Sequence, residues 1–172
     1  MNYHALHTPP PRAFHRDGLP LRRWLHLPTL LVASVAPDIE PFLVILLGLN
    51  YPLHGYLHTF LAAIPYGVLI GYAMSLLERP LSPLYRSLLL EDRVSESSFL
   101  LAGVIGTLSH VLLDSPLYGD IRPFYPIEEN PLYNPSLPIH EFCVLTLLIG
   151  ALMYLIILMR ASIHRASNSR DA

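Results

Sequence analysis

Ionisable side chains of the types that bind metals lie inside otherwise apolar stretches of this sequence. His54 and His58 are four residues apart, as are His110 and Asp114, and Asp38 lies in a third apolar stretch. On a helix, side chains four residues apart share one face and are about 5–6 Å apart at Cβ. Imidazole nitrogens combined with carboxylate oxygens, without a thiolate, suit zinc, and iron or manganese as well. The pattern therefore predicts a metal centre.

The ligand set is drawn from three stretches, and each member also has a structural interpretation. Asp38, one or both of His54 and His58, and the pair His110 and Asp114 would supply three or four ligands. His54 is equally typical of an interfacial histidine. His110 with Asp114 is also typical of a hydrogen bond between membrane helices. A carboxylate before a proline is a favoured helix cap, which accounts for one carboxylate near Asp38 but not for two.

Four apolar stretches would position these side chains: Leu27–Leu49, His58–Leu77, Ser97–Tyr118 and Phe142–Met159. The last has 18 residues without a charge, which is the length of a membrane-spanning helix. Hydrophobic residues make up 52% of the chain and charged residues only 14%, against about 25% charged residues in a soluble domain. We therefore expect an all-α fold in one domain, 1–172, built as an integral membrane bundle of about four spans.

The first stretch is interrupted by Pro37-Asp38-Ile39-Glu40-Pro41. Proline removes a backbone hydrogen bond and clashes with the preceding turn, so this segment predicts a first span broken at Pro37–Pro41. Broken helices at membrane depth persist only where the freed backbone is buried in protein or lines a water-filled cavity. The break therefore places Asp38 and Glu40 beside a candidate site.

The arginines predict the orientation. Ten of the eleven precede the first span, lie between the second and third, or follow the fourth, and only Arg122 lies on the other side. The positive-inside rule then places both termini in the cytoplasm, with several spans crossing the inner (cytoplasmic) membrane. The polar N-terminal arm 1–26, including His26, and the C-terminal tail 166–172 are expected to be solvated. The arm lacks the apolar core of a signal peptide.

The charge balance limits the classes of molecule that this chain is expected to bind. The formal net charge is −2, which disfavours a nucleic-acid binder because such a protein needs a basic field. The expected partners are membrane lipids and a lipid-like or amphiphilic small molecule, and no nucleic acid. A single cysteine, Cys143, excludes a disulfide framework and a zinc site built from cysteines.

Four motifs together resemble the YdjM-like family of inner-membrane proteins, which are regarded as metal-dependent hydrolases. They are Ala36-Pro37-Asp38-Ile39-Glu40-Pro41, His54–Thr59, Leu108–Asp114 and Gly119–Pro126. The family pattern has a second Asp where this chain has Glu40. More distantly, the family is similar to the zinc-dependent phospholipase C and nuclease P1 group. In that group a metal is held by an Asp, a His, and a second His with an Asp four residues further on.

The resemblance implies one metal centre in this chain. Its ligands would be Asp38, His58 or His54, His110 and Asp114. The spacing between the first two histidines differs from that of the family, so the choice between them stays open. The chain has no further histidine and glutamate set like the one that builds the additional zinc site of the phospholipases. The cofactor is therefore expected to be a single divalent metal, Zn²⁺ first, with Mn²⁺ or Fe²⁺ as alternatives.

The chemistry that follows is hydrolysis of a lipid or another amphiphilic (phospho)ester. A zinc ion lowers the pKa of its water toward about 7 and polarises the scissile group. Glu40 or Asp120 would be the general base, and carboxylates beside the ligands would fix the histidine tautomers. Arg122 would hold an anionic group of the substrate by paired hydrogen bonds. With Glu40 as the base, Glu40→Gln is expected to keep the metal and lose activity.

Two non-enzymatic functions remain as alternatives for the same residues. The cluster would serve as a metal or proton relay in a transporter, although transporters usually show paired half-repeats, which we do not find. Alternatively, a closed, four-coordinate metal would only stabilise the bundle.

Overall fold

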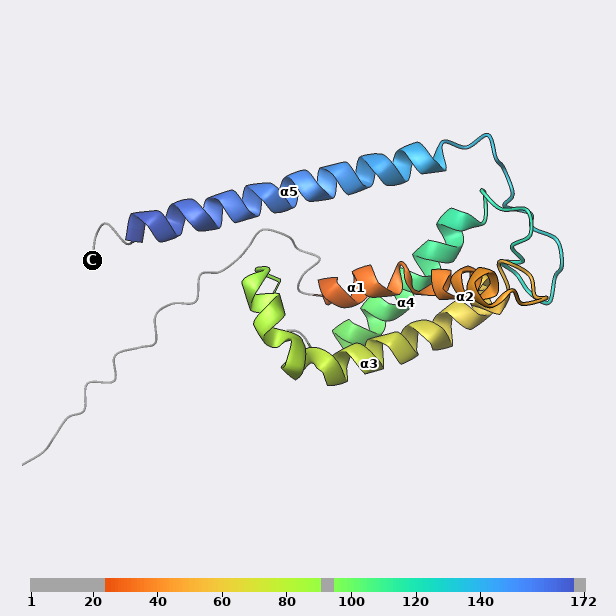
Figure 1. The fold of residues 1–172 in the computed structure, drawn as a ribbon, viewed down its shortest axis with the longest axis horizontal. Coiled ribbons are helices and arrows are strands. Elements are labelled where there is room, and N and C mark those ends of the chain that lie inside the picture. The colour runs from red at the N-terminus through yellow and green to blue at the C-terminus, as the bar shows by residue number, and fades with distance from the viewer. Residues whose placement is uncertain (1–23, 91–94, 169–172) are drawn as a thin grey trace, which may run out of the picture.

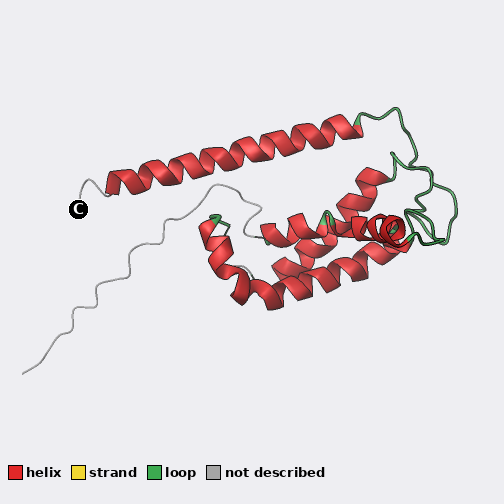
Figure 2. Cartoon of the chain, viewed as in Figure 1, coloured by secondary structure: helices red, strands yellow, loops and turns green. Residues whose placement is uncertain are grey.

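The structure is a computed structural model that describes residues 24–90 and 95–168. Its helices are α1 (Leu27–Ala33), α2 (Ile39–Leu47), α3 (Phe60–Ser87), α4 (Glu96–Asp114) and α5 (Ile139–Asn168), with short 3-10 turns η2 (Ala36–Asp38) and η3 (Tyr56–His58). The described part of the chain contains no strand (Figure 2). Four segments are long and apolar enough to cross a membrane: Leu27–Leu47, Phe60–Ser87, Glu96–Asp114 and Ile139–Ile163. The all-α fold with four candidate spans is confirmed.

The first span is broken where its prolines predict. Pro37 lies in η2, and Pro41 lies in the first turn of α2, where a missing backbone N–H removes no helical hydrogen bond. Figure 1 shows α2 nearly end-on while α1 runs across the page, so the chain turns sharply between them. α2 ends at Gly48, whose φ of 59° is the left-handed conformation of a helix C-cap. The break brings Asp38 to a corner of the backbone.

α3 and α4 form the main packed interface. Glycines let the two backbones approach so closely that a Cβ atom on Gly103 would lie 2.0 Å from the carbonyl oxygen of Gly67. The hydroxyl of Thr107 donates across the interface to the carbonyl of Ala63, at 2.7 Å. Small residues and hydroxyl hydrogen bonds of this kind are what join helices in membranes, where burial of apolar surface gives no net drive.

α5 lies apart from the other helices along one side of the molecule (Figure 1). The hydroxyl of Tyr154 donates to the carbonyl of Leu88, just after α3, at 2.9 Å. No residue of its apolar segment Ile139–Ile163 is buried within the described structure. The packed unit of the described chain is therefore formed by α1, α3 and α4.

Two helices are longer than the sequence predicts. α3 continues through Glu78-Arg79-Pro80 to Ser87 with Pro65, Pro80 and Pro83 inside it, and Figure 1 shows it bending in its last turns. A proline costs one backbone hydrogen bond and kinks a helix without necessarily ending it. α5 begins before the apolar run and extends to Asn168, so the first residues of the expected tail, 166–168, are helical. Residues 1–23 of the expected N-terminal arm and residues 169–172 lie outside the described residues.

The end of the N-terminal arm is not solvated, contrary to expectation. His26 is fully buried. Its ring packs on Phe99 and Tyr85, with centroid distances of 4.1 and 5.5 Å. Its Nδ1 lies 2.7 Å from the hydroxyl oxygen of Thr29, and its Nε2 lies 3.4 Å from a carboxylate oxygen of Glu78. This histidine can be buried because the hydroxyl of Thr29 satisfies one of its ring nitrogens. The rings of Phe99 and Tyr85, from α4 and α3, surround it.

Candidate metal centre

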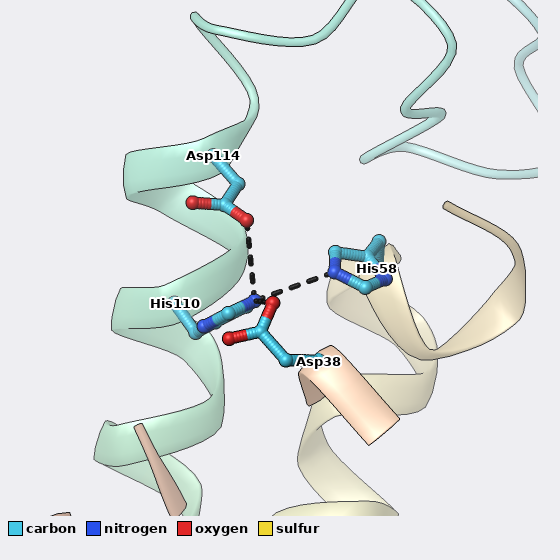
Figure 3. Close-up of side chains that lie close together, drawn as sticks. All are labelled: Asp38, His58, His110 and Asp114. Atoms are coloured by element: carbon cyan, nitrogen blue, oxygen red, sulfur yellow. Dashed lines mark hydrogen bonds and ion pairs between the residues drawn. The ribbon is translucent and has the colours of Figure 1, made fainter. Parts of the chain in front are cut away.

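Four side chains converge at the end of the bundle where α3 begins and α4 ends. His110 and Asp114 lie one turn apart on α4, Asp38 ends η2, and His58 ends η3 (Figure 3). One ligand atom from each lies within 4.8 Å of all the others. We refer to these residues as the four-residue cluster. It contains the expected carboxylates Asp38 and Asp114, and of the two candidate histidines it contains His58 and not His54.

The spacing of the ligand atoms fits a small cation. The Nε2 atom of His110 lies 3.2 Å from Oδ2 of Asp114, 3.3 Å from Nε2 of His58 and 3.6 Å from Oδ1 of Asp38. Ligands at 2.0–2.2 Å from a tetrahedral zinc ion are about 3.4 Å from one another. These three distances, all measured from Nε2 of His110, lie on either side of that value, and the remaining pairs of ligand atoms lie within 4.8 Å of one another.

The second nitrogen of each histidine fixes the tautomer of its ring. Nδ1 of His110 is 2.8 Å from the carbonyl oxygen of Ser34, and Nδ1 of His58 is 3.0 Å from a carboxylate oxygen of Glu40. Both partners only accept, so both Nδ1 atoms carry the proton. The lone pairs of both Nε2 atoms then point into the four-residue cluster. An oxygen acceptor on the far nitrogen is the usual arrangement of histidines that bind metals.

The cluster needs a positive charge. Two neutral imidazoles oriented in this way bring their Nε2 lone pairs to 3.3 Å of each other, with two carboxylates beside them. Within the described residues, the ion pairs of these four side chains involve only histidines and carboxylates, and no arginine. Since His58 is fully buried and His110 nearly so, solvent cannot screen this repulsion well. A divalent cation, or protonation of the histidines, removes it.

Glu40 is held in place by several donors. Its carboxylate accepts from Nδ1 of His58, from the backbone N–H groups of Gly55 (2.9 Å) and Leu57 (3.1 Å), and from the hydroxyl of Tyr51 (3.2 Å). Both oxygens take part. This geometry suits a carboxylate that orients a histidine ligand. The sequence suggests two roles for carboxylates at this site, general base and partner that fixes a histidine tautomer, and the contacts of Glu40 fit the second.

His54 lies next to the cluster in a separate pair. Its Nδ1 is 3.0 Å from both carboxylate oxygens of Asp120, and its ring packs on Tyr118 (centroids 4.4 Å apart) and edge-on against His58 (4.8 Å). Burial alone would raise the pKa of Asp120, but the hydrogen bond and charge of His54 outweigh it and hold that pKa below its ordinary value. Asp120 is thus anchored to His54 on the loop that follows α4.

The expectation that His54 and His58 share a helix face is wrong. Only the second is in a helical turn, because α3 does not begin until Phe60, where Thr59 caps it by accepting from the backbone N–H of Ala62. Gly55, whose backbone is not helical, lies between the two histidines, and its N–H donates to Glu40 instead of to a helix. The rings meet nevertheless, because the loop folds back.

Arg122 lies on the same loop as Asp120, after α4. Its guanidinium is 3.5 Å from a carboxylate oxygen of Glu128, and both side chains are well exposed. The structure places it outside the four-residue cluster. Its expected role in binding an anionic group stays a prediction.

Two contacts could not be found from the sequence. The carbonyl of Ser34 that holds His110 is a backbone group 76 residues away, and no side-chain pattern reports it. The hydroxyl of Tyr51 that reaches Glu40 belongs to a residue outside the motifs that the sequence singles out. The Pro-bracketed carboxylates were the available signal, and they indicate the segment but not its partners.

A family model described as YdjM inner membrane protein matches residues 5–169, nearly the whole chain. The chain belongs to the YdjM inner membrane protein family. This confirms the family that the motifs indicate, and the four apolar helices agree with its membrane location. The YdjM description names a location and no activity. No curated protein and no solved structure matches the chain, so the distant similarity to zinc-dependent phospholipases stays a prediction.

Proposed function

We propose that this YdjM protein is a membrane-embedded, metal-dependent hydrolase that acts on a lipid or another amphiphilic (phospho)ester. The observation that carries the proposal is the pair of imidazole Nε2 atoms of His58 and His110, 3.3 Å apart, with the carboxylates of Asp38 and Asp114 beside them. Histidine and carboxylate ligands in a dry environment favour Zn²⁺, with Mn²⁺ or Fe²⁺ as alternatives.

The residues of the chain divide into holding, orienting and proton-handling roles. His58, His110, Asp38 and Asp114 would hold the metal, which when bound supplies an acidic water and polarises the ester group. Glu40 and the carbonyl of Ser34 orient the two imidazoles through their Nδ1–H groups.

The proton and the substrate's anionic group are assigned to the adjoining loop. Asp120, ionised and about half exposed beside His54, is the general base that this geometry leaves available. Arg122, on the same loop, would bind an anionic group of the substrate.

An open coordination position distinguishes a hydrolase from a structural metal site. Three members of the four-residue cluster have largely buried side chains, whereas the side chain of Asp38 is 54% exposed. The carboxylate at the backbone corner is therefore the ligand that a substrate can approach. This exposure favours a catalytic site over a closed one.

Metal content of the detergent-purified protein tests the proposal. We expect close to one metal per chain in the wild type and loss of that metal in His110→Ala and Asp114→Ala. Glu129→Ala, which removes an exposed loop carboxylate outside the cluster, is the matched control and should retain it.

The metal-loaded wild type is then assayed with a phospholipid and with a carboxylic ester of similar chain length. Hydrolysis that disappears in Asp114→Ala supports the proposal. A wild type without metal would overturn it, and the cluster would then be a proton relay or a hydrogen-bonded network. Stoichiometric metal without hydrolysis of either substrate would make the site structural.

A further inference from the structure

The most exposed member of the four-residue cluster lies in a segment that exposes apolar side chains. Asp38 is followed directly by Ile39 (45% exposed), and Val35, three residues before it, is 61% exposed. One turn further, Phe42 is also exposed. These residues belong to the broken first span, Leu27–Leu47, little of which is buried in the protein. The side on which the cluster is reachable is therefore the side of the bundle that the first span presents to its surroundings.

The loop that follows α4 packs against the start of α3, next to His58 of the cluster. Ile121 and Pro123 of that loop are fully buried, and the carbonyl of Pro123 accepts from the backbone N–H of Phe60 at 2.9 Å, which fastens the loop to the start of α3. The ring of His54, packed between Tyr118 and His58, fills the space next to the buried ligand. On the side of this loop, the ring of His54 therefore covers His58.

α2 has the surface of a helix surrounded by hydrocarbon. Only Val44 is buried among its nine residues, and large apolar side chains are exposed around the rest of it: Ile39, Phe42, Leu43, Ile45, Leu46 and Leu47. A helix that docks on one partner has one apolar stripe, whereas a helix apolar on nearly every side sits within a core or a membrane. No Asp, Glu, His, Lys or Arg follows Glu40 until His54. Lipid, rather than a second protein surface, fits this helix.

A carboxylate exposed among lipid-facing side chains is costly unless a cation neutralises it. Asp38 is in this position, and it is also a candidate ligand of the four-residue cluster. A cation bound there would attract an anionic group that arrives from the same side. A phospholipid carries both parts that this surface recognises: a phosphodiester for the cation and acyl chains for the exposed face of α2.

We propose that the metal centre opens sideways into the bilayer at the break in the first span. A phospholipid enters past Val35 and Ile39, its phosphate group reaches Asp38 and the metal, and its chains stay beside α2. This inference rests on the proposed function for the identity of the reaction. The sideways opening itself rests on exposure and packing, and it is tested separately.

Tryptophan fluorescence in vesicles tests the opening without reference to activity. The chain has a single tryptophan, Trp24, so the probes are placed in a Trp24→Phe background. Val35→Trp puts a probe at the opening, and Tyr133→Trp puts a matched probe on the outer loop, where Tyr133 is 48% exposed. Phosphatidylcholine with brominated acyl chains quenches tryptophans in contact with lipid, and iodide quenches those in contact with water.

We expect Val35→Trp to lose most of its fluorescence in brominated vesicles and little to iodide, and Tyr133→Trp to show the reverse. Strong iodide quenching of Val35→Trp, with little from the brominated lipid, would overturn the sideways opening whatever the enzyme does.

A second measurement separates this inference from the proposed function. Val35→Trp narrows the opening without removing a ligand, so it should keep its metal and hydrolyse vesicle phospholipid about tenfold more slowly than the Trp24→Phe parent. An unchanged rate would overturn the entry route. A parent with no metal or no hydrolysis would overturn the proposed function, while the quenching result would still decide whether the site faces lipid.

Discussion

The carboxylate of Glu40 accepts the Nδ1–H of His58 and the backbone N–H groups of Gly55 and Leu57. A side chain held by this many donors has few lone pairs left to take a proton from water. Glu40 does, however, fix the orientation of the His58 ring, whose Nε2 atom points into the cluster. At the scale of single residues, the charge of Glu40 therefore acts through His58.

Glu40→Gln should weaken metal binding without abolishing it. The amide keeps the size of the side chain but replaces one acceptor oxygen by a donor, so the orientation of His58 is less well fixed. Losing such a partner typically costs 10–100-fold in metal affinity. Titration with a competing chelator measures the change, with Glu128→Gln on the exposed loop as the control. Unchanged affinity with lost hydrolysis would instead identify Glu40 as the general base.

At the scale of helices, the cluster depends on how closely α3 and α4 approach. His58 immediately precedes α3, and His110 lies two turns beyond Gly103 on α4. The approach is fixed at Gly67 and Gly103, where backbone meets backbone. The distance between the two imidazoles is therefore set partly by residues that carry no functional group.

Gly103→Ala should destabilise the protein and lower its metal affinity together. The new Cβ would lie 2.0 Å from the carbonyl oxygen of Gly67, and since a backbone atom cannot rotate away, the helices must separate. Overpacking of this kind typically costs about 1–3 kcal/mol of unfolding free energy. Thermal unfolding in detergent, with and without added zinc, reports both effects.

Gly150→Ala is the control, because nothing lies within 4 Å of the position that its Cβ would occupy. In the middle of α5 the alanine should be neutral or stabilising, by up to about 1 kcal/mol. Equal losses of stability in the two variants would show that close approach of α3 and α4 is not the cause.

The helices also show which features of the site a sequence can predict. His110 and Asp114 share one turn of α4, so their spacing alone brings them within 3.2 Å. The prolines around Asp38 act on their own backbone and break the first span where expected. By contrast, whether His54 or His58 joins the cluster depends on contacts with Glu40 and Asp120, which are distant in sequence.

The burial of His26 and the length of α3 could not be predicted for a similar reason. Phe99 and Tyr85 enclose His26 only after three segments have packed together. Pro80 is a local signal for a helix end, but the helix continues with a bend. Local patterns predict local geometry, and both of these features are decided by packing.

At the scale of the whole molecule, we infer from the arginines that the cluster lies near the outer face of the membrane. Cysteine labelling checks this in a Cys143→Ser background. Ser136→Cys, on the exposed loop before α5, should react with a membrane-impermeant maleimide added to intact cells, and Ser97→Cys, at the start of α4, should react only after the cells are opened. The reverse pattern would place the termini outside and the metal centre at the cytoplasmic face.

The separation of α5 from the other helices has a consequence for the order of synthesis. All four members of the cluster, from Asp38 to Asp114, leave the ribosome before the first residue of α5. Because α5 supplies no member of the cluster and makes few contacts with the rest, insertion of the first three spans completes the set of groups that would bind a cation. The proposed centre can therefore be complete while the last span is still being translated.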